Sequence, residues 1–173
     1  PKDDIDENEI RQAKMVHAGS VNMTKEPARG ANLYAMKLAH DHGKLVSFDV
    51  NYRDTLWANE AACQEVADQV YDSVDFLKIS EEELYFVGGE ENIPAFMKEH
   101  GISVVIETLG ADGAKYFFDG HTGHQPGHKV HAVDATGAGD AFWGGFLSRI
   151  LMRGVTTKTD LTATIVKEAH RHG

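Results

Sequence analysis

The chain has 173 residues, which is about the size of one domain, because domains average roughly 150 residues. Hydrophobic residues make up 42% of it, enough for a buried core, so a chain disordered throughout is excluded. Its 27 acidic and 17 basic side chains leave a formal net charge of −10. Nucleic acid requires a basic surface and anionic lipid repels an acidic one, so we expect neither nucleic acid nor a membrane as a partner.

Cys63 is the single cysteine, which excludes a disulfide framework and any cysteine-based zinc site and favours a reducing compartment. The apolar stretches are shorter than the roughly 18 residues that a membrane span requires. The first eight residues are acidic, whereas a secretory leader is basic. We therefore expect the protein to be cytoplasmic.

Short apolar runs alternate with amphipathic segments, a pattern typical of a parallel sheet covered by helices. Strands are expected over 13–18, 45–50, 75–79 and 104–108, and helices over 27–43, 59–74, 80–88, 93–99, 140–152 and 160–171. Residues 114–118 and 129–133 are expected to pair as an antiparallel hairpin, with a turn at Asp119 and Gly120 and a polar segment rich in His and Gly between them. The pattern predicts one α/β domain over 1–173, with a mainly parallel sheet, helices on both faces and a ligand site at the carboxyl ends of the strands.

The segment 133–145 carries the most chemistry, because a strand is followed there by a turn of small residues and then by a helix. Gly137 and Gly139 let a ligand approach the backbone, and the unpaired amides of a first helical turn attract an anion, here a phosphate. Asp140 lies beside these amides and suits a general base that takes a proton from an acceptor hydroxyl. The alternative is that the glycines only cap a turn and that Asp140 is an ordinary helix-initiating carboxylate.

The motif Asp134-Ala-Thr-Gly-Ala-Gly-Asp140-Ala-Phe resembles the C-terminal signature of the ribokinase-like sugar kinases, the PfkB family. Segments 17–20, 48–53 with Trp57, 78–84 and 108–113 are similar to other motifs of that family and occur in the family's order. They look like the fructokinase and 2-keto-3-deoxygluconate kinase branch. The resemblance implies a ribokinase-like core.

The resemblance also implies roles for individual residues. Asp140 would be the catalytic base, and Gly137, Ala138 and Gly139 would form the anion hole for the γ-phosphate of ATP. Glu83 would act on Mg²⁺ through water, and Asp134 with the carbonyl of Thr136 resembles half of a monovalent-cation site that binds K⁺. The residues expected to line the nucleotide are Ser80, Thr108, Leu109, Gly110, Ala111, Asp112 and Gly113. Ser80 stands where the family usually has Asn.

Three residues at the end of the second expected strand form a candidate clamp for the substrate or for a phosphate. The planar guanidinium of Arg53 suits oxyanions, and Asp49 and Asn51 lie at the same strand end. The alternative for Asp49 and Asn51 is a strand-terminal turn with an ion pair.

The function that the resemblance implies is ATP-dependent phosphorylation of a sugar hydroxyl, as in fructokinase or 2-keto-3-deoxygluconate kinase. A kinase of nucleosides or of aminoimidazole riboside, and a catalytically silent nucleotide-binding or interaction fragment, are the alternatives. Family members are nearly twice as long, and a segment before residue 1 supplies their sugar contacts and a β-sheet lid that forms a homodimer. We therefore expect an incomplete core without the lid sheet, with little or no kinase activity alone.

Several other residues are expected to have structural roles. The apolar side chains of Phe142, Trp143, Phe146 and Leu147 are expected in the core, and Cys63 in helix packing. His121, His124, His128 and His131 lack the regular spacing of a metal site, and a solvated loop over 120–127 is expected instead. His170 and His172 are expected at the surface.

Overall fold

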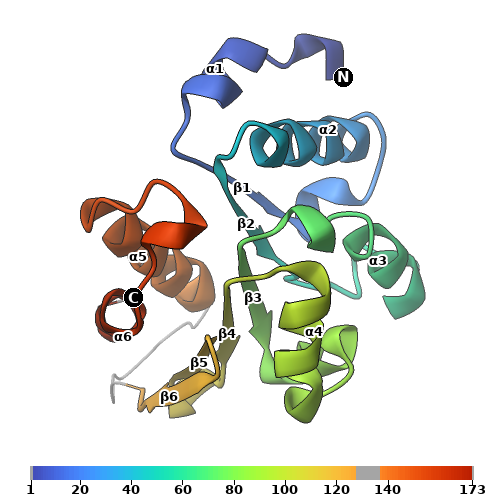
Figure 1. The fold of residues 1–173 in the computed structure, drawn as a ribbon. Coiled ribbons are helices and arrows are strands. Elements are labelled where there is room, and N and C mark those ends of the chain that lie inside the picture. The colour runs from blue at the N-terminus through green and yellow to red at the C-terminus, as the bar shows by residue number, and fades with distance from the viewer. Residues whose placement is uncertain (1, 128–136, 173) are drawn as a thin grey trace.

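A single sheet of six strands forms the centre of the structure, a computed structural model that describes residues 2–127 and 137–172 (Figure 1). The strands lie side by side in chain order. Their bounds are Met15–Gly19 (β1), Leu45–Asp49 (β2), Phe76–Ser80 (β3), Val104–Thr108 (β4), Ala114–Phe118 (β5) and His121–Gln125 (β6). The first four pair in parallel, and β5 and β6 extend the sheet in antiparallel pairing. The predicted α/β class with a mainly parallel sheet is confirmed.

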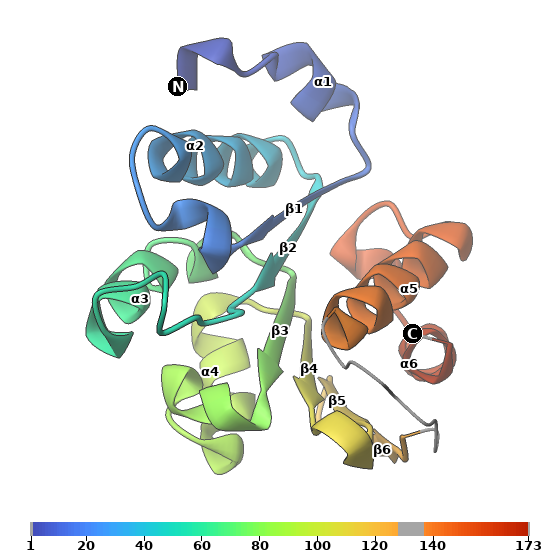
Figure 2. The ribbon, with the colours of Figure 1, turned by 180° about the vertical axis from the view of Figure 1, so that it is seen from behind.

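Helices cover both faces of this sheet, as Figures 1 and 2 show from opposite sides. One face packs against α2 (Ala28–Asp41), α3 (Glu60–Ala67) and α4 (Ile93–His100), and the other against α5 (Ala138–Met152) and α6 (Ala163–Arg171). The short helix α1 (Glu7–Gln12) lies outside α2. Two separate apolar cores result, because successive side chains of a strand point to opposite faces. No helix among the described residues is long and apolar enough to cross a membrane.

The core contains the apolar side chains that the sequence assigns to it. Cys63 is fully buried in the α2–α4 core, and Trp143, Phe146 and Leu147 are buried in the α5–α6 core. Phe142 is partly buried beside them. The strands β2 and β3 are buried along almost their whole length, which agrees with the apolar residues that make up most of each strand.

The third helix is shorter than the expected range 59–74. It begins after Asn59, whose side chain accepts a hydrogen bond from the Ala62 amide, and it ends at Ala67. A 3-10 turn, Tyr71–Ser73, follows it. Tyr71 is completely buried in edge-to-face contact with Phe96, and this contact fixes the turn. The periodicity of apolar residues in the sequence does not show where a turn held by such a contact ends a helix.

The hairpin partner of β5 is β6 and not the expected segment 129–133, which lies outside the described residues, as do His128 and His131. The turn predicted at Asp119 and Gly120 is confirmed: both residues have positive φ angles (46° and 73°), as a tight two-residue hairpin turn requires, and the chain reverses directly there. The segment predicted as a loop is therefore β6. Its Gly123 pairs with Tyr116, and a Cβ there would lie 2.3 Å from the tyrosine ring, so the strand lacks the side chains that normally reveal one.

His170 is buried, which corrects the surface position expected for it, whereas His172 is exposed. The ring of His170 makes an edge contact with Tyr116 on β5 and a second edge contact with Phe142 on α5. The exposed fraction of His170 is 2%, and its Nε2 has no hydrogen-bond partner among the described residues. Burial lowers the pKa of His170 to about 4.

This burial predicts that acid destabilises the fold. The unfolded chain binds a proton at His170 near pH 6.5, whereas the folded chain binds it only near pH 4. The stabilisation is therefore complete above pH 6.5 and is lost as the pH falls from 6.5 to 4, by about 2 kcal/mol at pH 5. Urea unfolding at pH 7 and pH 5 measures the effect. His170→Phe should reduce the pH dependence by that amount and His172→Phe should not; an unchanged slope in His170→Phe contradicts the assignment.

Candidate functional site

The carboxyl ends of the parallel strands bring most of the predicted site residues to one edge of the sheet. Asp49 at the end of β2 stands opposite Lys78 on β3, and Ser80 at the end of β3 stands opposite Thr108 at the end of β4. The amino terminus of α5 reaches the same edge, because a Cβ placed on Gly139 would lie 3.6 Å from the side chain of Lys78. Segments about 30 residues apart or more along the chain thus meet where the fold class predicts a ligand site.

The first turn of α5 provides amides for an anion. Gly137 precedes the helix with a φ angle of 81°, a left-handed conformation that glycine adopts without strain. The amide of Ala141 is the first that donates to a carbonyl of this turn, that of Gly137, at 2.9 Å. The preceding amides of Ala138, Gly139 and Asp140 therefore have no acceptor within the helix. Together with the positive end of a fifteen-residue helix they suit a phosphate.

Asp140 is exposed in this first turn, and its charge acts on the neighbouring strands. Burial raises the pKa of Asp49, and the Asp140 carboxylate contributes to that increase. Burial and the Lys78 ammonium lower the pKa of His17, while its hydrogen bonding to Ser47 and the charge of Asp140 act in the opposite direction. The carboxylate of Asp140 is thus electrostatically coupled to the polar side chains at the edge of the sheet.

An ion pair occupies the sheet beneath α5. Lys78 Nζ lies 2.7 Å from Asp49 Oδ2, and the two residues are only 6% and 3% exposed. An ion pair is the alternative role that the sequence analysis gives for Asp49. On the next strand, His17 Nδ1 lies 3.0 Å from Ser47 Oγ. A row of polar side chains therefore crosses β1, β2 and β3 on the face covered by α5.

Asn51 and Arg53 follow β2 at the same edge. Asn51 has a φ angle of 39°, an uncommon left-handed conformation for a residue other than glycine, and its carbonyl accepts a hydrogen bond of 3.4 Å from Ser20 Oγ. Arg53 is exposed, and its guanidinium forms no ion pair with any described residue. Its cationic end is accordingly available to a soluble anion.

Glu83 is held by the backbone. Its Oε1 accepts a hydrogen bond from the amide of Tyr52 at 2.6 Å, and its Oε2 accepts one from the amide of Ser80 at 2.8 Å. The carboxylate therefore connects the loop after β2 to the start of the 3-10 helix Glu81–Val87. Each oxygen keeps a second lone pair, which suits a water-mediated contact with a cation better than a direct one.

The predicted nucleotide-lining segment forms a compact turn after β4. The amide of Leu109 donates to the carbonyl of Gly113 at 2.8 Å, and the 3-10 helix Gly110–Asp112 lies between them. Gly113 has a φ angle of 97°, and a Cβ there would lie 1.9 Å from the carbonyl oxygen of Gln125, so no other residue fits. Ala111 and Asp112 are exposed on this turn, which lies beside Ser80 through the pairing of β3 with β4.

Two of the predicted site residues, Asp134 and Thr136, lie outside the described residues. Among the residues that are described, no group of three or more His, Cys, Asp or Glu side chains is placed to hold a metal ion. The structure adds Lys78 and His17 to the site. A signal for Lys78 was present in the sequence, because its charged side chain stands between the apolar residues Leu77 and Ile79.

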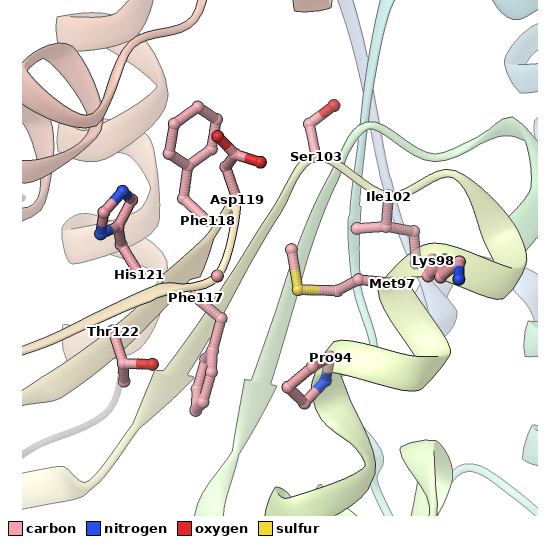
Figure 3. A pocket seen from close by; sticks show the side chains of 11 residues that line it. Pro94, Met97, Lys98, Ile102, Ser103, Phe117, Phe118, Asp119, His121 and Thr122 are labelled. Atoms are coloured by element: carbon pink, nitrogen blue, oxygen red, sulfur yellow. The ribbon is translucent and has the colours of Figure 1, made fainter.

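A cavity of about 520 Å³ lies elsewhere (Figure 3). It is lined by Met97 on α4, by Ile102 and Ser103 before β4, and by Phe117 and His121 of the β5–β6 hairpin. The cavity is therefore at the amino end of β4, whereas the predicted site residues lie at the carboxyl ends of the parallel strands. None of those predicted residues lines it.

Comparisons with known proteins identify a family and similar sequences. Residues 1–165 match the family described as pfkB family carbohydrate kinase. Fructokinase-1 of Oryza sativa subsp. japonica is 37% identical over 146 residues, which are 82% of this chain and 45% of that protein. Fructokinase-1 of Zea mays is 36% identical over 153 residues, which are 86% of this chain and 47% of that protein. The chain spans about half the length of the curated relatives it matches.

Solved structures of two kinases are similar to this fold. The fructokinase of Vibrio cholerae O395, in its form with fructose, ADP and a calcium ion, has a TM-score of 0.78 and 29% identity over 90% of this chain and 50% of its own. The aminoimidazole riboside kinase of Salmonella enterica has a TM-score of 0.76 and 29% identity over 91% of this chain and 53% of its own.

Proposed function

The chain belongs to the PfkB family of carbohydrate kinases, and from this premise we propose that it carries the nucleotide- and phosphoryl-binding part of an ATP-dependent sugar kinase. The reaction is transfer of the γ-phosphoryl group of ATP to a carbohydrate hydroxyl, as the fructokinase relatives suggest. Residues 1–173 act as one nucleotide-binding core in this proposal. We also propose that the full-length protein forms a homodimer through a lid sheet that is not part of residues 1–173.

The observation that carries the proposal is the first turn of α5, where amides without an acceptor inside the helix and a carboxylate lie at one point of the sheet edge. The anion hole consists of Gly137, Ala138 and Gly139, and the amides of Ala138 and Gly139, which have no acceptor within the helix, hold the charge of the transferring phosphoryl group. Asp140 accepts the proton of the acceptor hydroxyl as the oxygen attacks phosphorus. Positioning and charge stabilisation supply most of the catalysis in phosphoryl transfer, so this geometry suits that chemistry.

The cofactor roles rest on the character of the available donors. Bound Mg²⁺ neutralises charge on the phosphates, and Glu83, an anionic oxygen donor whose oxygens already bind backbone amides, would hold it through water. Asp134 and Thr136 stay a proposed K⁺ site. The turn from Thr108 to Gly113, next to Ser80, lines the nucleotide in this proposal, and Arg53 with Asn51 contacts the substrate or a phosphate.

A nucleoside-type acceptor is the second candidate, because the aminoimidazole riboside kinase of Salmonella enterica has nearly the same fold similarity as the fructokinase. The machinery at α5 is equally suited to a sugar hydroxyl and to the hydroxyl of a riboside. A catalytically silent nucleotide-binding fragment differs from both in lacking turnover.

Binding and turnover measurements test these proposals. MgATP at about 100 times its dissociation constant should stabilise the chain by about 2.7 kcal/mol, measured as a rise in the melting temperature. ADP release from the full-length gene product is then measured with fructose, 2-keto-3-deoxygluconate and aminoimidazole riboside. Release with fructose supports the leading proposal, and release with the riboside alone supports the second. Nucleotide binding without release indicates a silent binder, and no response to MgATP contradicts the proposed function.

A further inference from the structure

Lys78 is a buried cation at the carboxyl edge of the sheet. Its side chain leaves β3 on the face covered by α5, and its exposed fraction is 6%. Its ammonium pairs with Asp49 Oδ2 at 2.7 Å. Burial of two charges is costly unless they are well paired and hydrogen-bonded, so a pair retained at this depth calls for an explanation.

The pairing is incomplete among the described residues. Asp49 Oδ1 is buried and has no hydrogen-bond partner there. The ammonium of Lys78 carries three N–H donors, and the bond to Asp49 uses one of them. Both partners of the pair therefore keep hydrogen-bonding capacity that the described part of the chain does not use.

The surroundings of the ammonium favour an anion. A Cβ on Gly139 would lie 3.6 Å from Lys78 Nζ, so the cation lies directly against the first turn of α5. That turn is the positive end of the helix dipole, where a cation is unfavourable and an anion favourable. The helix end and the ammonium both attract an anion, and among the described residues Asp49 is the ion-pair partner of the ammonium.

From these contacts we infer that Lys78 binds the terminal phosphoryl group of the nucleotide and that Asp49 is its internal counter-ion. The inference rests on the proposed function and adds a residue to its site. A phosphoryl group bound at the first turn of α5 takes up the free N–H donors of Lys78. Asp49 holds the ammonium in place and, because its carboxylate competes for the same cation, limits the affinity for phosphate.

The inference predicts opposite effects for the two partners. Lys78→Met should weaken MgATP binding by about tenfold or more, because a hydrogen bond to a charged group is lost. MgADP lacks the terminal phosphoryl group and should be weakened less, and adenosine should be unaffected. Asp49→Asn, which keeps the shape of the side chain, should tighten MgATP binding severalfold.

Isothermal titration of the chain with MgATP, MgADP and adenosine measures these affinities. Lys115→Met is the matched control, because Lys115 Nζ also pairs with carboxylates, Glu90 at 2.8 Å and Glu107 at 3.4 Å, but does not lie against α5. It should leave all three affinities unchanged. If Lys78→Met does not fold, the double variant Lys78→Met with Asp49→Asn removes both charges together, and it should show the same selective loss of MgATP affinity.

The results separate this inference from the proposed function. If the unsubstituted chain binds MgATP and the variants that lack Lys78 bind it equally well, the role of Lys78 is wrong and the proposed function stands. An equal loss for MgATP, MgADP and adenosine also overturns the inference, because it indicates a general effect on the fold. So does weaker MgATP binding by Asp49→Asn. If the unsubstituted chain binds no nucleotide, the proposed function fails and this inference fails with it.

Discussion

Replacing Asp140 by Asn is expected to lower sugar-dependent ADP release by about a hundredfold to ten-thousandfold, the usual contribution of a general base. The substitution preserves shape and removes the proton acceptor, so MgATP binding should stay at least as tight. The first turn of α5 keeps its amides, and one negative charge beside the phosphates disappears. Steady-state turnover of the full-length gene product gives the rate, and isothermal titration gives the affinity.

Asp119→Asn is the matched control for this prediction. Asp119 is also exposed, but it lies in the β5–β6 turn at the opposite edge of the sheet, beside the cavity of Figure 3. Asparagine tolerates its positive φ angle of 46°, so the fold should be unaffected. Turnover that survives in Asp140→Asn at the level of Asp119→Asn would show that another group takes the proton.

Phe146→Ala is expected to destabilise the fold by about 3–5 kcal/mol, the usual cost of removing a buried aromatic ring. Phe146 is completely buried between α5 and the sheet. Its ring meets Phe76 of β3 edge-on at 6.3 Å and stacks on Trp143 at 5.2 Å. These contacts hold α5 against the strands, so the loss should also weaken MgATP binding at its first turn. Urea unfolding measures the change.

The fluorescence of Trp143 reports directly on this helix. The chain has two tryptophans, so Trp57→Phe leaves Trp143 as the single probe. Met152→Ala is the control on the same helix, because Met152 is 75% exposed and its loss should change stability by less than about 0.5 kcal/mol. Equal stability of the two variants would mean that α5 is not held by the Phe146 contacts.

Local patterns in the sequence predicted a candidate phosphate site within one helix. Gly137 and Asp140 carry this prediction, because glycine and a first helical turn can form such a site locally. The same reasoning did not single out Lys78, whose proposed role depends on the strand beside it and on the packing of α5 against it. It also left Asp49 between two roles, since an ion pair across two strands depends on their register.

The alternation of apolar strands with helices determined the class of fold, because periods of about two and 3.6 residues are properties of the chain itself. The sequence predicted the turn at Asp119 and Gly120, whereas the pairing of β6 directly after that turn was decided by the sheet, because the segment has no apolar residue. The burial of His170 was decided by the packing of α6 against Tyr116 and Phe142. Such outcomes depend on contacts between segments distant in sequence, which only the assembled tertiary structure brings together.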